Sequence, residues 1–230
     1  SYDENGPGKL FDGTGANDGD HWWSECLECS PGTAQPDAAQ SSCAKCVAGK
    51  YQELQAQTAC ERCTVGSYCA LGASAPLPCP SGRHQNGTMT ALNLSMTSVD
   101  DCVECPAGAF CSTGAATPSE CSPGEVQPQT NQRSCAKCVA GKFMNESGQT
   151  ACFECVAGSY CEEGSSAPLP CKEGTFSNTS GLGTEDQCTI CPTGSSCSTG
   201  VTEPTLCSPG TVQPDEGRGC LLYTSPSPRD

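Results

Sequence analysis

A regular ladder of cysteines is the feature that most limits how this chain can fold. Each of the first 22 of its 23 cysteines is followed three residues later by a glycine or by another cysteine. Seven open a Cys-x-x-Cys pair and fifteen open Cys-x-x-Gly, and four of those fifteen follow another Cys-x-x-Gly cysteine by six residues. We interpret the seven and the four as closing cysteines of small disulfide loops, and the other eleven as opening cysteines. Closing and opening cysteines then alternate along the chain.

Joining each opening cysteine to the next closing cysteine gives a hypothesis for the disulfide pairing. The pairs are Cys29–Cys43, Cys46–Cys60, Cys63–Cys69, Cys79–Cys102, Cys105–Cys111, Cys121–Cys135, Cys138–Cys152, Cys155–Cys161, Cys171–Cys188 and Cys191–Cys197. A crossed arrangement, such as Cys63–Cys79 with Cys69–Cys102, is the main alternative, because sequence alone does not decide connectivity. Cys26 is then a closing cysteine without an opener, and Cys207 an opener without a closer. We expect both to be unpaired by truncation, as if a longer ladder had been cut at its two ends.

The composition favours a small disulfide-rich fold. Cysteine makes up a tenth of the 230 residues, whereas Leu, Ile, Val and Phe together number only 27 and the net charge is −15. Without cross-links such a chain would be disordered, but each closed loop of about 15 residues removes roughly 3 kcal/mol of unfolded-state entropy. We expect an elongated array of short β-hairpin loops stapled by disulfides, with little regular secondary structure and no large core.

The ladder contains a long repeat that sets the expected domain organisation. It begins at Cys29 and restarts at Cys121 and Cys207, and 32 of the first 51 positions are identical between the first two copies. Including Cys26, we divide the chain into repeat 1 (26–120), repeat 2 (121–206) and the start of a truncated repeat 3 (207–219). Repeat arrays of this kind contact mainly their neighbours.

The two ends differ from the repeats. Residues 1–25 are rich in Asp, Asn and Gly and are predicted to be an acidic linker, with Trp22 and Trp23 as its one bulky apolar cluster. Residues 220–230 resemble the translation of a sequencing-library adapter, and Cys220 follows Cys207 by 13 residues where the ladder has 14. We treat that tail as non-native and expect residues 1–219 to be an internal piece of a larger protein.

Several observations indicate an extracellular protein. Persistent disulfides require an oxidising compartment, and four glycosylation sequons begin at Asn86, Asn93, Asn145 and Asn178. The acidic balance argues against nucleic acid as a partner, and no run of about 18 apolar residues is present to insert into a membrane. We expect an extracellular or cell-surface location, in a membrane-anchored protein.

The segments Cys46-Val-Ala-Gly-Lys-Tyr51, Cys60-Glu-Arg-Cys63 and Cys155-Val-Ala-Gly-Ser-Tyr160 resemble a known family. They are similar to the ephrin type-A/B receptor-like cysteine-rich modules of the growth-factor-receptor cysteine-rich superfamily, and the 14-residue loop is similar to that of tumour-necrosis-factor-receptor repeats. The resemblance covers Cys26 to Cys207. It implies a part of a large surface or secreted protein and brings no catalytic residues with it.

A zinc site is the main alternative use of the cysteines. Cys43, Cys46, Cys60 and Cys63 have the spacing of a four-cysteine zinc site, but eight further cysteines lie outside any Cys-x-x-Cys pair. His84 stands in a long polar loop and is expected to be solvated. We therefore expect no cofactor, no bound metal and no enzymatic activity.

Three functions are compatible with the sequence. The first is a spacer or stalk that presents neighbouring domains of the same chain. The second is a receptor-type module that binds a protein partner, and an intracellular zinc-binding array is a distant third.

Overall fold

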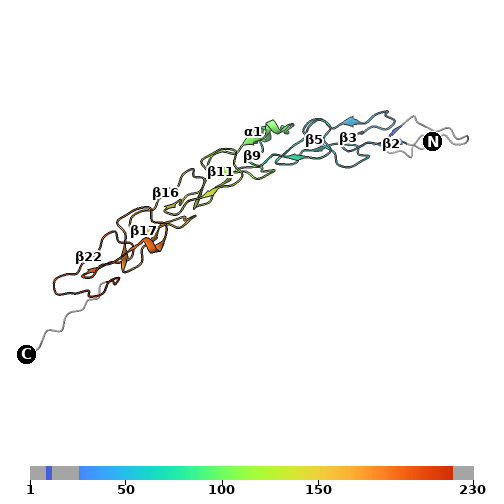
Figure 1. Cartoon of the computed structure of the whole chain (residues 1–230). Coiled ribbons are helices and arrows are strands. Elements are labelled where there is room, and N and C mark those ends of the chain that lie inside the picture. Colours follow the sequence, from blue (N-terminus) through green and yellow to red (C-terminus); the bar gives the residue numbers. More distant parts are fainter. Residues whose placement is uncertain (1–8, 12–25, 220–230) are drawn as a thin grey trace, which may run out of the picture. The chain divides into compact units, whose positions relative to one another are not determined.

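The computed structural model describes residues 9–11 and 26–219 (Figure 1). These residues fall into two compact units, one made of 9–11, 26–105, 111–118 and 131–133, the other of 106–110, 119–130 and 134–219. The rest of the predicted linker, with Trp22 and Trp23, and the tail 220–230 lie outside the described residues.

Both units are built from short antiparallel hairpins, each a separate two-stranded sheet (Figure 1). The strand pairs are β1 (Lys9–Phe11) with β2 (Cys26–Glu28), β3 (Thr33–Ala34) with β4 (Ala44–Lys45), β5 (Lys50–Tyr51) with β6 (Glu61–Arg62), β7 (Ser67–Tyr68) with β8 (Leu77–Pro78), β9 (Arg83–His84) with β10 (Val103–Glu104), β11 (Ala109–Phe110) with β12 (Ser119–Glu120), β13 (Glu125–Val126) with β14 (Ala136–Lys137), β15 (Lys142–Phe143) with β16 (Phe153–Glu154), β17 (Ser159–Tyr160) with β18 (Leu169–Pro170), β19 (Thr175–Phe176) with β20 (Thr189–Ile190), and β21 (Ser195–Ser196) with β22 (Thr205–Leu206). The predicted fold class, short hairpins stapled by disulfides without a large core, is confirmed.

Ten disulfides close these hairpins, one within each hairpin from β3 to β22. They are Cys29–Cys43, Cys46–Cys60, Cys63–Cys69, Cys79–Cys102, Cys105–Cys111, Cys121–Cys135, Cys138–Cys152, Cys155–Cys161, Cys171–Cys188 and Cys191–Cys197. Each bond links an opening cysteine to the next closing one, so the structure has the sequential pairing and not the crossed alternative. We name each hairpin after its opening cysteine.

The spacing of the cysteines follows from the hairpin geometry. In the Cys29 hairpin the amide of Thr33 donates to the carbonyl of Ser30 at 3.0 Å, and Gly32 has a φ of 83°, which glycine adopts without steric cost. The first strand starts there and pairs with the two residues before Cys46, Thr33 with Lys45 and Ala34 with Ala44. The two residues inside each Cys-x-x-Cys pair are thus the second strand of a hairpin, which explains why that spacing recurs.

Backbone hydrogen bonds join each hairpin to the one that follows it. In the second unit the amide of Gly124 donates to the carbonyl of Met144 at 2.7 Å, and the carbonyl of Gly124 accepts from the amide of Cys138 at 2.8 Å. Farther along the loop, the amide of Gly148 donates to the carbonyl of Cys121 at 2.9 Å. The same three kinds of bond recur in the first unit, so neighbouring hairpins satisfy one another's backbone groups.

The motif glycines also make room for the second hairpin along. A β-carbon on Gly124 would collide with the carbonyl oxygen of Gly164, which lies two hairpins farther on. The same collision would occur for Gly32 against Gly72, Gly66 against Gly114, Gly108 against Gly148, Gly141 against Gly181, Gly158 against Gly200 and Gly174 against Gly217. Each of these seven turns is therefore packed against a turn of the second hairpin along.

The interior consists mainly of half-cystines, and one position of each hairpin contributes a side chain to it. That side chain stands six residues after the opening cysteine, and we call its place the sixth position. It is held by Gln35, Gln52, Cys69, Gln85, Cys111, Gln127, Met144, Cys161, Ser177, Cys197 and Gln213, all of them buried except the half-buried Gln85. The closing cysteines of the six-residue disulfides thus occupy the place that glutamine takes in longer loops.

A buried glutamine at the sixth position ties its loop together. The Nε2 atom of Gln127 donates to the carbonyl of Ser134 at 2.7 Å, and its Oε1 atom accepts from the amide of Gln129 at 3.1 Å. Gln52 makes the equivalent bonds to Ala59 and Leu54. These bonds offset the cost of burying the carboxamide.

Within residues 9–11 and 26–219, helical structure is confined to two loops. The loop of the Cys79 hairpin holds α1 (Gly87–Ala91) and the 3-10 helix η1 (Val99–Asp101), and the loop of the Cys171 hairpin holds the 3-10 helix η2 (Glu185–Gln187). In the described part of the chain, no helix has the length and apolar character needed to cross a membrane.

Candidate interaction site

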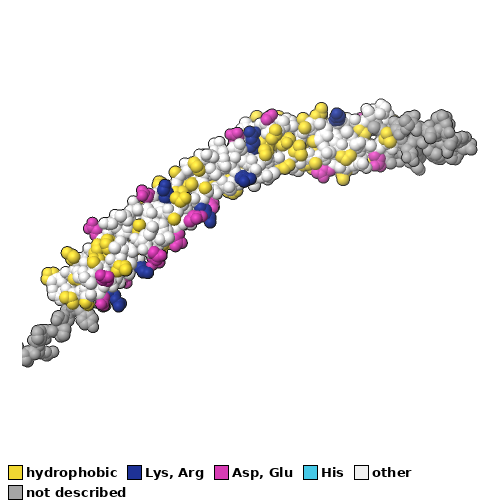
Figure 2. All heavy atoms as spheres, viewed as in Figure 1, with side chains coloured by type: hydrophobic (Ala, Val, Ile, Leu, Met, Phe, Trp, Pro, Cys, Tyr) yellow, Lys and Arg dark blue, Asp and Glu magenta, His cyan; other side chains and the backbone are white. Residues whose placement is uncertain are grey.

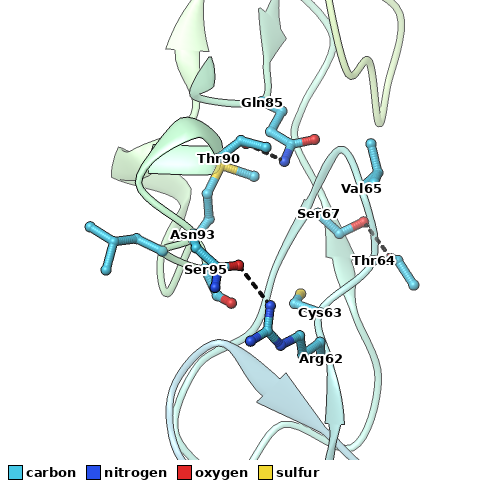
Figure 3. Close-up of a pocket in the computed structure, with 11 residues that line it drawn as sticks. Arg62, Cys63, Thr64, Val65, Ser67, Gln85, Thr90, Asn93 and Ser95 are labelled. Atoms are coloured by element: carbon cyan, nitrogen blue, oxygen red, sulfur yellow. Dashed lines mark hydrogen bonds between the residues drawn. The ribbon is translucent and has the colours of Figure 1, made fainter. Parts of the chain in front are cut away.

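The long loop of the Cys79 hairpin, residues 80–101, builds a cavity of about 200 Å³ in the first unit (Figure 3). One wall comes from the Cys63 hairpin and the residue before it, and the other from α1 and the segment after it. The lining residues are Arg62, Cys63, Thr64, Val65, Ser67, Gln85, Thr90, Asn93, Leu94, Ser95 and Met96. Sites for drug-sized ligands usually measure about 300–1,000 Å³, so this cavity fits only a small group.

Hydrogen bonds cross the cavity from one wall to the other (Figure 3). Arg62 donates from a terminal guanidinium nitrogen to Oδ1 of Asn93 at 2.8 Å. Gln85 accepts from the amide of Gly66 at 2.9 Å and donates to Oγ1 of Thr90 at 2.7 Å. The sixth-position glutamine of this hairpin therefore joins the Cys63 hairpin to α1.

A small apolar cluster supports the far wall of the cavity. Met96 is 3% exposed and packs with Cys79 and Cys102, and the half-buried Tyr68 and Met89 lie against these three residues. These contacts fix the loop to the disulfide of its own hairpin. The wall of the cavity that this loop forms is therefore ordered.

Apolar side chains are exposed around the cavity. Val65 is 71% exposed, Leu92 65% and Leu94 56%. Figure 2 shows hydrophobic side chains gathered on the face around α1. Exposed apolar patches with polar rims are common at sites of interaction.

The corresponding part of repeat 2 is built differently. Its loop, residues 172–187, is six residues shorter than 80–101 and has no counterpart of α1. Glu154 stands where repeat 1 has Arg62, one residue before the opening cysteine, and its Oε1 atom accepts from Ser180 at 3.2 Å. Repeat 1 thus differs from repeat 2 in charge and in loop structure at this one place.

The four sequon asparagines are all at least partly accessible. Asn86 is half-buried and caps α1, its Oδ1 atom accepting from the amides of Thr88 at 3.1 Å and Met89 at 3.3 Å. Asn93, Asn145 and Asn178 are exposed. Asn93 has a positive φ of 56°, a conformation that asparagine tolerates better than most residues.

The remaining candidate residues are distributed along the array. Cys26 begins β2 and forms no disulfide with any described residue. Cys207 directly follows β22, and its amide donates to the carbonyl of Gly194 at 3.0 Å. His84 is half-buried rather than solvated as predicted, because it belongs to β9 and its Nδ1 atom lies 2.7 Å from the carbonyl oxygen of Gln85.

The four cysteines with zinc-site spacing are divided among three disulfides. Cys43 is bonded to Cys29, Cys46 to Cys60 and Cys63 to Cys69. Within residues 9–11 and 26–219, no group of three His, Cys, Asp or Glu side chains is placed to hold a metal ion. The structure thus uses these sulfurs to close loops.

Two features of the site escape reasoning from sequence. The Arg62–Asn93 bond joins residues 31 positions apart, and no spacing pattern marks the two as partners. The sixth position is regular in sequence, but Gln, Cys, Met and Ser share no chemical type. Only the repeated distance of six residues from an opening cysteine identifies it.

Comparisons with known proteins give no assignment: no family model matches this sequence, and no curated protein matches it.

Proposed function

We propose that this chain is a non-catalytic extracellular segment of a larger surface or secreted protein, and that it acts as a spacer that presents neighbouring domains. The resemblance to ephrin receptor-like cysteine-rich modules supports the proposal. So do the exposed sequon asparagines Asn93, Asn145 and Asn178, and the ten disulfides, which persist in oxidising compartments. We further propose that the whole protein is anchored to a membrane.

One observation carries the spacer function: the motif turn of each hairpin forms backbone hydrogen bonds with the next hairpin. Gly32 donates to Gln52, and Gly49 in turn donates to Cys69. Stability in such an array is a sum of local terms and does not depend on a large core. A segment of this kind can be lengthened or shortened by whole repeats without a change in its local structure.

The spacer function is tested by changing the number of repeats. Deleting residues 121–206 joins Glu120 to Cys207, which opens with the same Cys-Ser-Pro-Gly sequence as Cys121. Duplicating residues 121–206 adds one repeat in the same register. We expect small-angle X-ray scattering to show maximum dimensions that fall and rise by equal increments in the two variants. A compact protein would instead change as a weak power of its length, about N^0.38, and that result would contradict a spacer.

A receptor-type binding module is the second candidate, and the cavity beside α1 favours it. The length of a spacer depends only on its number of repeats. The Cys79 hairpin, however, has a longer loop, a helix and the exposed Leu92 and Leu94, all of which repeat 2 lacks. Replacing residues 80–101 with residues 172–187 converts this loop to that of repeat 2. A spacer keeps its scattering dimensions and its presentation of flanking domains after this exchange. Loss of cell binding by the exchanged protein, with unchanged dimensions, would favour the receptor function.

A further inference from the structure

The rim of the cavity beside α1 is itself a glycosylation sequon. Asn93 and Ser95 both line the cavity, and Leu94 between them is another lining residue that remains 56% exposed. The covalent bond to Asn93 would therefore place the first sugar of a glycan at the mouth of the cavity.

The hydrogen bond from Arg62 leaves the side-chain amide nitrogen of Asn93 free to carry a glycan. Arg62 donates to Oδ1 of Asn93 at 2.8 Å and so holds the carbonyl side of the carboxamide. An N-linked glycan is carried by the other side, the amide nitrogen, and the guanidinium has further N–H groups available for sugar hydroxyl or acetamido oxygens. Figure 3 shows Arg62 and Asn93 reaching toward each other from opposite walls.

The size and lining of the cavity suit one sugar ring. Its volume of about 200 Å³ leaves room for a single ring and is below the roughly 300–1,000 Å³ of sites for drug-sized ligands. Val65 and Leu94 offer apolar surface to the C–H face of a pyranose ring, while Thr64, Gln85 and Ser95 offer polar groups to its edge.

We propose that the first N-acetylglucosamine of an N-linked glycan on Asn93 occupies this cavity and holds the Cys63 hairpin against the α1 loop. The glycan is then a structural part of repeat 1 rather than only a solubilising group. This inference rests on the proposed extracellular function, because N-glycosylation takes place in the secretory pathway.

Repeat 2 provides an internal comparison. Asn178 is also exposed and also begins a sequon, but Glu154 occupies the place of Arg62 and accepts from the sequon residue Ser180. The carboxylate is already bonded to Ser180, and the shorter loop has no counterpart of α1 to form a second wall. A glycan on Asn178 is therefore expected to extend into solvent without ordering its loop.

The test uses the full chain from a eukaryotic secretory host, with peptide mapping of all four sequons and hydrogen exchange of the two loops. Ser95→Ala removes the sequon but keeps Asn93 and its bond to Arg62. We expect this variant to exchange at least about fivefold faster in residues 87–96 than the wild-type protein. Ser180→Ala removes the Asn178 sequon in repeat 2, and its loop is expected to exchange as before.

Two controls separate the glycan from the side chains. Ser95→Thr keeps the sequon and is expected to keep the slow exchange. In protein secreted to a bacterial periplasm, which carries no glycan, Ser95→Ala and wild type are expected to exchange equally fast. If Ser95→Ala alters exchange there by the same factor, the serine and not the sugar holds the loop, and the inference is wrong.

Failure of this inference is distinguishable from failure of the proposed function. Occupied Asn145 and Asn178 with an empty Asn93, or an occupied Asn93 whose loss leaves exchange unchanged, overturns only the glycan's structural role. Four empty sequons in protein from the eukaryotic host would overturn both. Contacts between the acetyl methyl group and the methyl groups of Val65 or Leu94, measured by nuclear Overhauser effects, would support the placement directly.

Discussion

At the scale of single residues, the motif glycine has two separable roles. Gly124 and Gly194 both have positive φ, 88° and 73°, but only Gly124 faces the carbonyl of a later turn, whereas the space at Gly194 is open among the described residues. The pair therefore distinguishes the cost of the backbone conformation from the cost of a collision.

We predict that Gly194→Ala destabilises its hairpin by about 1–2 kcal/mol, the cost of a left-handed conformation. Gly124→Ala is expected to cost about 1–3 kcal/mol more, because the added methyl group must displace the turn at Gly164. Hydrogen exchange of the Cys121, Cys155 and Cys191 hairpins measures both changes. Equal losses for the two variants would show that the collision is relieved without cost.

The buried glutamines make a second prediction at this scale. Gln127→Leu keeps the size of the side chain but removes the bonds to the Ser134 carbonyl and the Gln129 amide. We expect a loss of about 1–3 kcal/mol in the free energy of unfolding of that hairpin. The exposed Gln40→Leu is the matched control and is expected to change it by less than about 0.5 kcal/mol. A neutral Gln127→Leu would mean that the buried apolar surface replaces the lost bonds, as Met144 does at its own sixth position.

Sequence predicts the cysteine framework well because each cysteine is marked by a partner residue three positions on. Joining neighbours along the ladder gives the same ten pairs that the structure contains, since each pair closes one local loop. The sixth position is harder to predict because most of its residues share only burial and a backbone carbonyl that accepts from the preceding motif glycine, as Met144 does from Gly124, whereas Gln85 accepts from Gly66 through its side chain. Those are properties of packing between hairpins, which no single hairpin encodes.

At the scale of elements, the two long loops end in the same way but with different chemistry. In repeat 1, Asp101 accepts from the amides of Thr97 and Ser98 and from the Thr97 hydroxyl. In repeat 2, Gln187 accepts from the amides of Gly183 and Thr184. In both loops the residue before the closing cysteine caps the loop. In repeat 1 it is the charged Asp101, and in repeat 2 it is the neutral Gln187.

Only the charged cap responds to pH. The bond from the Thr97 amide, with those from Ser98 and the Thr97 hydroxyl, holds the pKa of Asp101 below its usual value. A depressed pKa means that the stabilisation is present above the unfolded-state pKa and is lost as the pH falls through the folded-state value. We predict that hydrogen exchange in residues 97–102 accelerates below about pH 4, whereas residues 183–188 keep their protection.

Exchanging the two caps supplies the control. Asp101→Gln should make the repeat 1 loop insensitive to acid, and Gln187→Asp should make the repeat 2 loop sensitive. An acid response that persists in Asp101→Gln would show that the cap is not its source.

The helix α1 lies beyond sequence prediction for a related reason. Its five residues are far shorter than an independently stable helix. It forms because Asn86 caps it and because Met89 packs on the cluster of Met96, Cys79 and Cys102. The cavity beside it depends on these tertiary contacts, so the sequence alone gives no indication of the site.

At the scale of the whole molecule, stability depends on the cross-links. Among the described residues, 15 of the 20 buried apolar side chains are half-cystines, and each 14-residue loop removes roughly 3 kcal/mol of unfolded-state entropy. Since folded domains are stable by only about 5–15 kcal/mol in total, the loss of a few disulfides exceeds the margin.

We predict that full reduction unfolds the chain under otherwise native conditions. The hydrodynamic radius should rise toward that of an unfolded chain, and protection of the hairpin amides should disappear. Reoxidation with a glutathione buffer is the control and should restore both. A reduced chain that keeps its native exchange pattern would show that the backbone bonds between hairpins suffice without the disulfides.

The contact of a motif glycine such as Gly124 with the second turn along sets a minimum number of hairpins that are disturbed when one hairpin opens. A reductase or protease that opens one hairpin also removes the turn that covers the motif glycine of the second hairpin before it. The backbone N–H and C=O groups of the hairpin in between lose their partners as well. Opening one hairpin therefore disrupts contacts of three hairpins, and this raises the free energy of local opening. The same three-hairpin span is the shortest length over which an inserted or exchanged hairpin must match its surroundings, so whole repeats are easier to transplant than single hairpins.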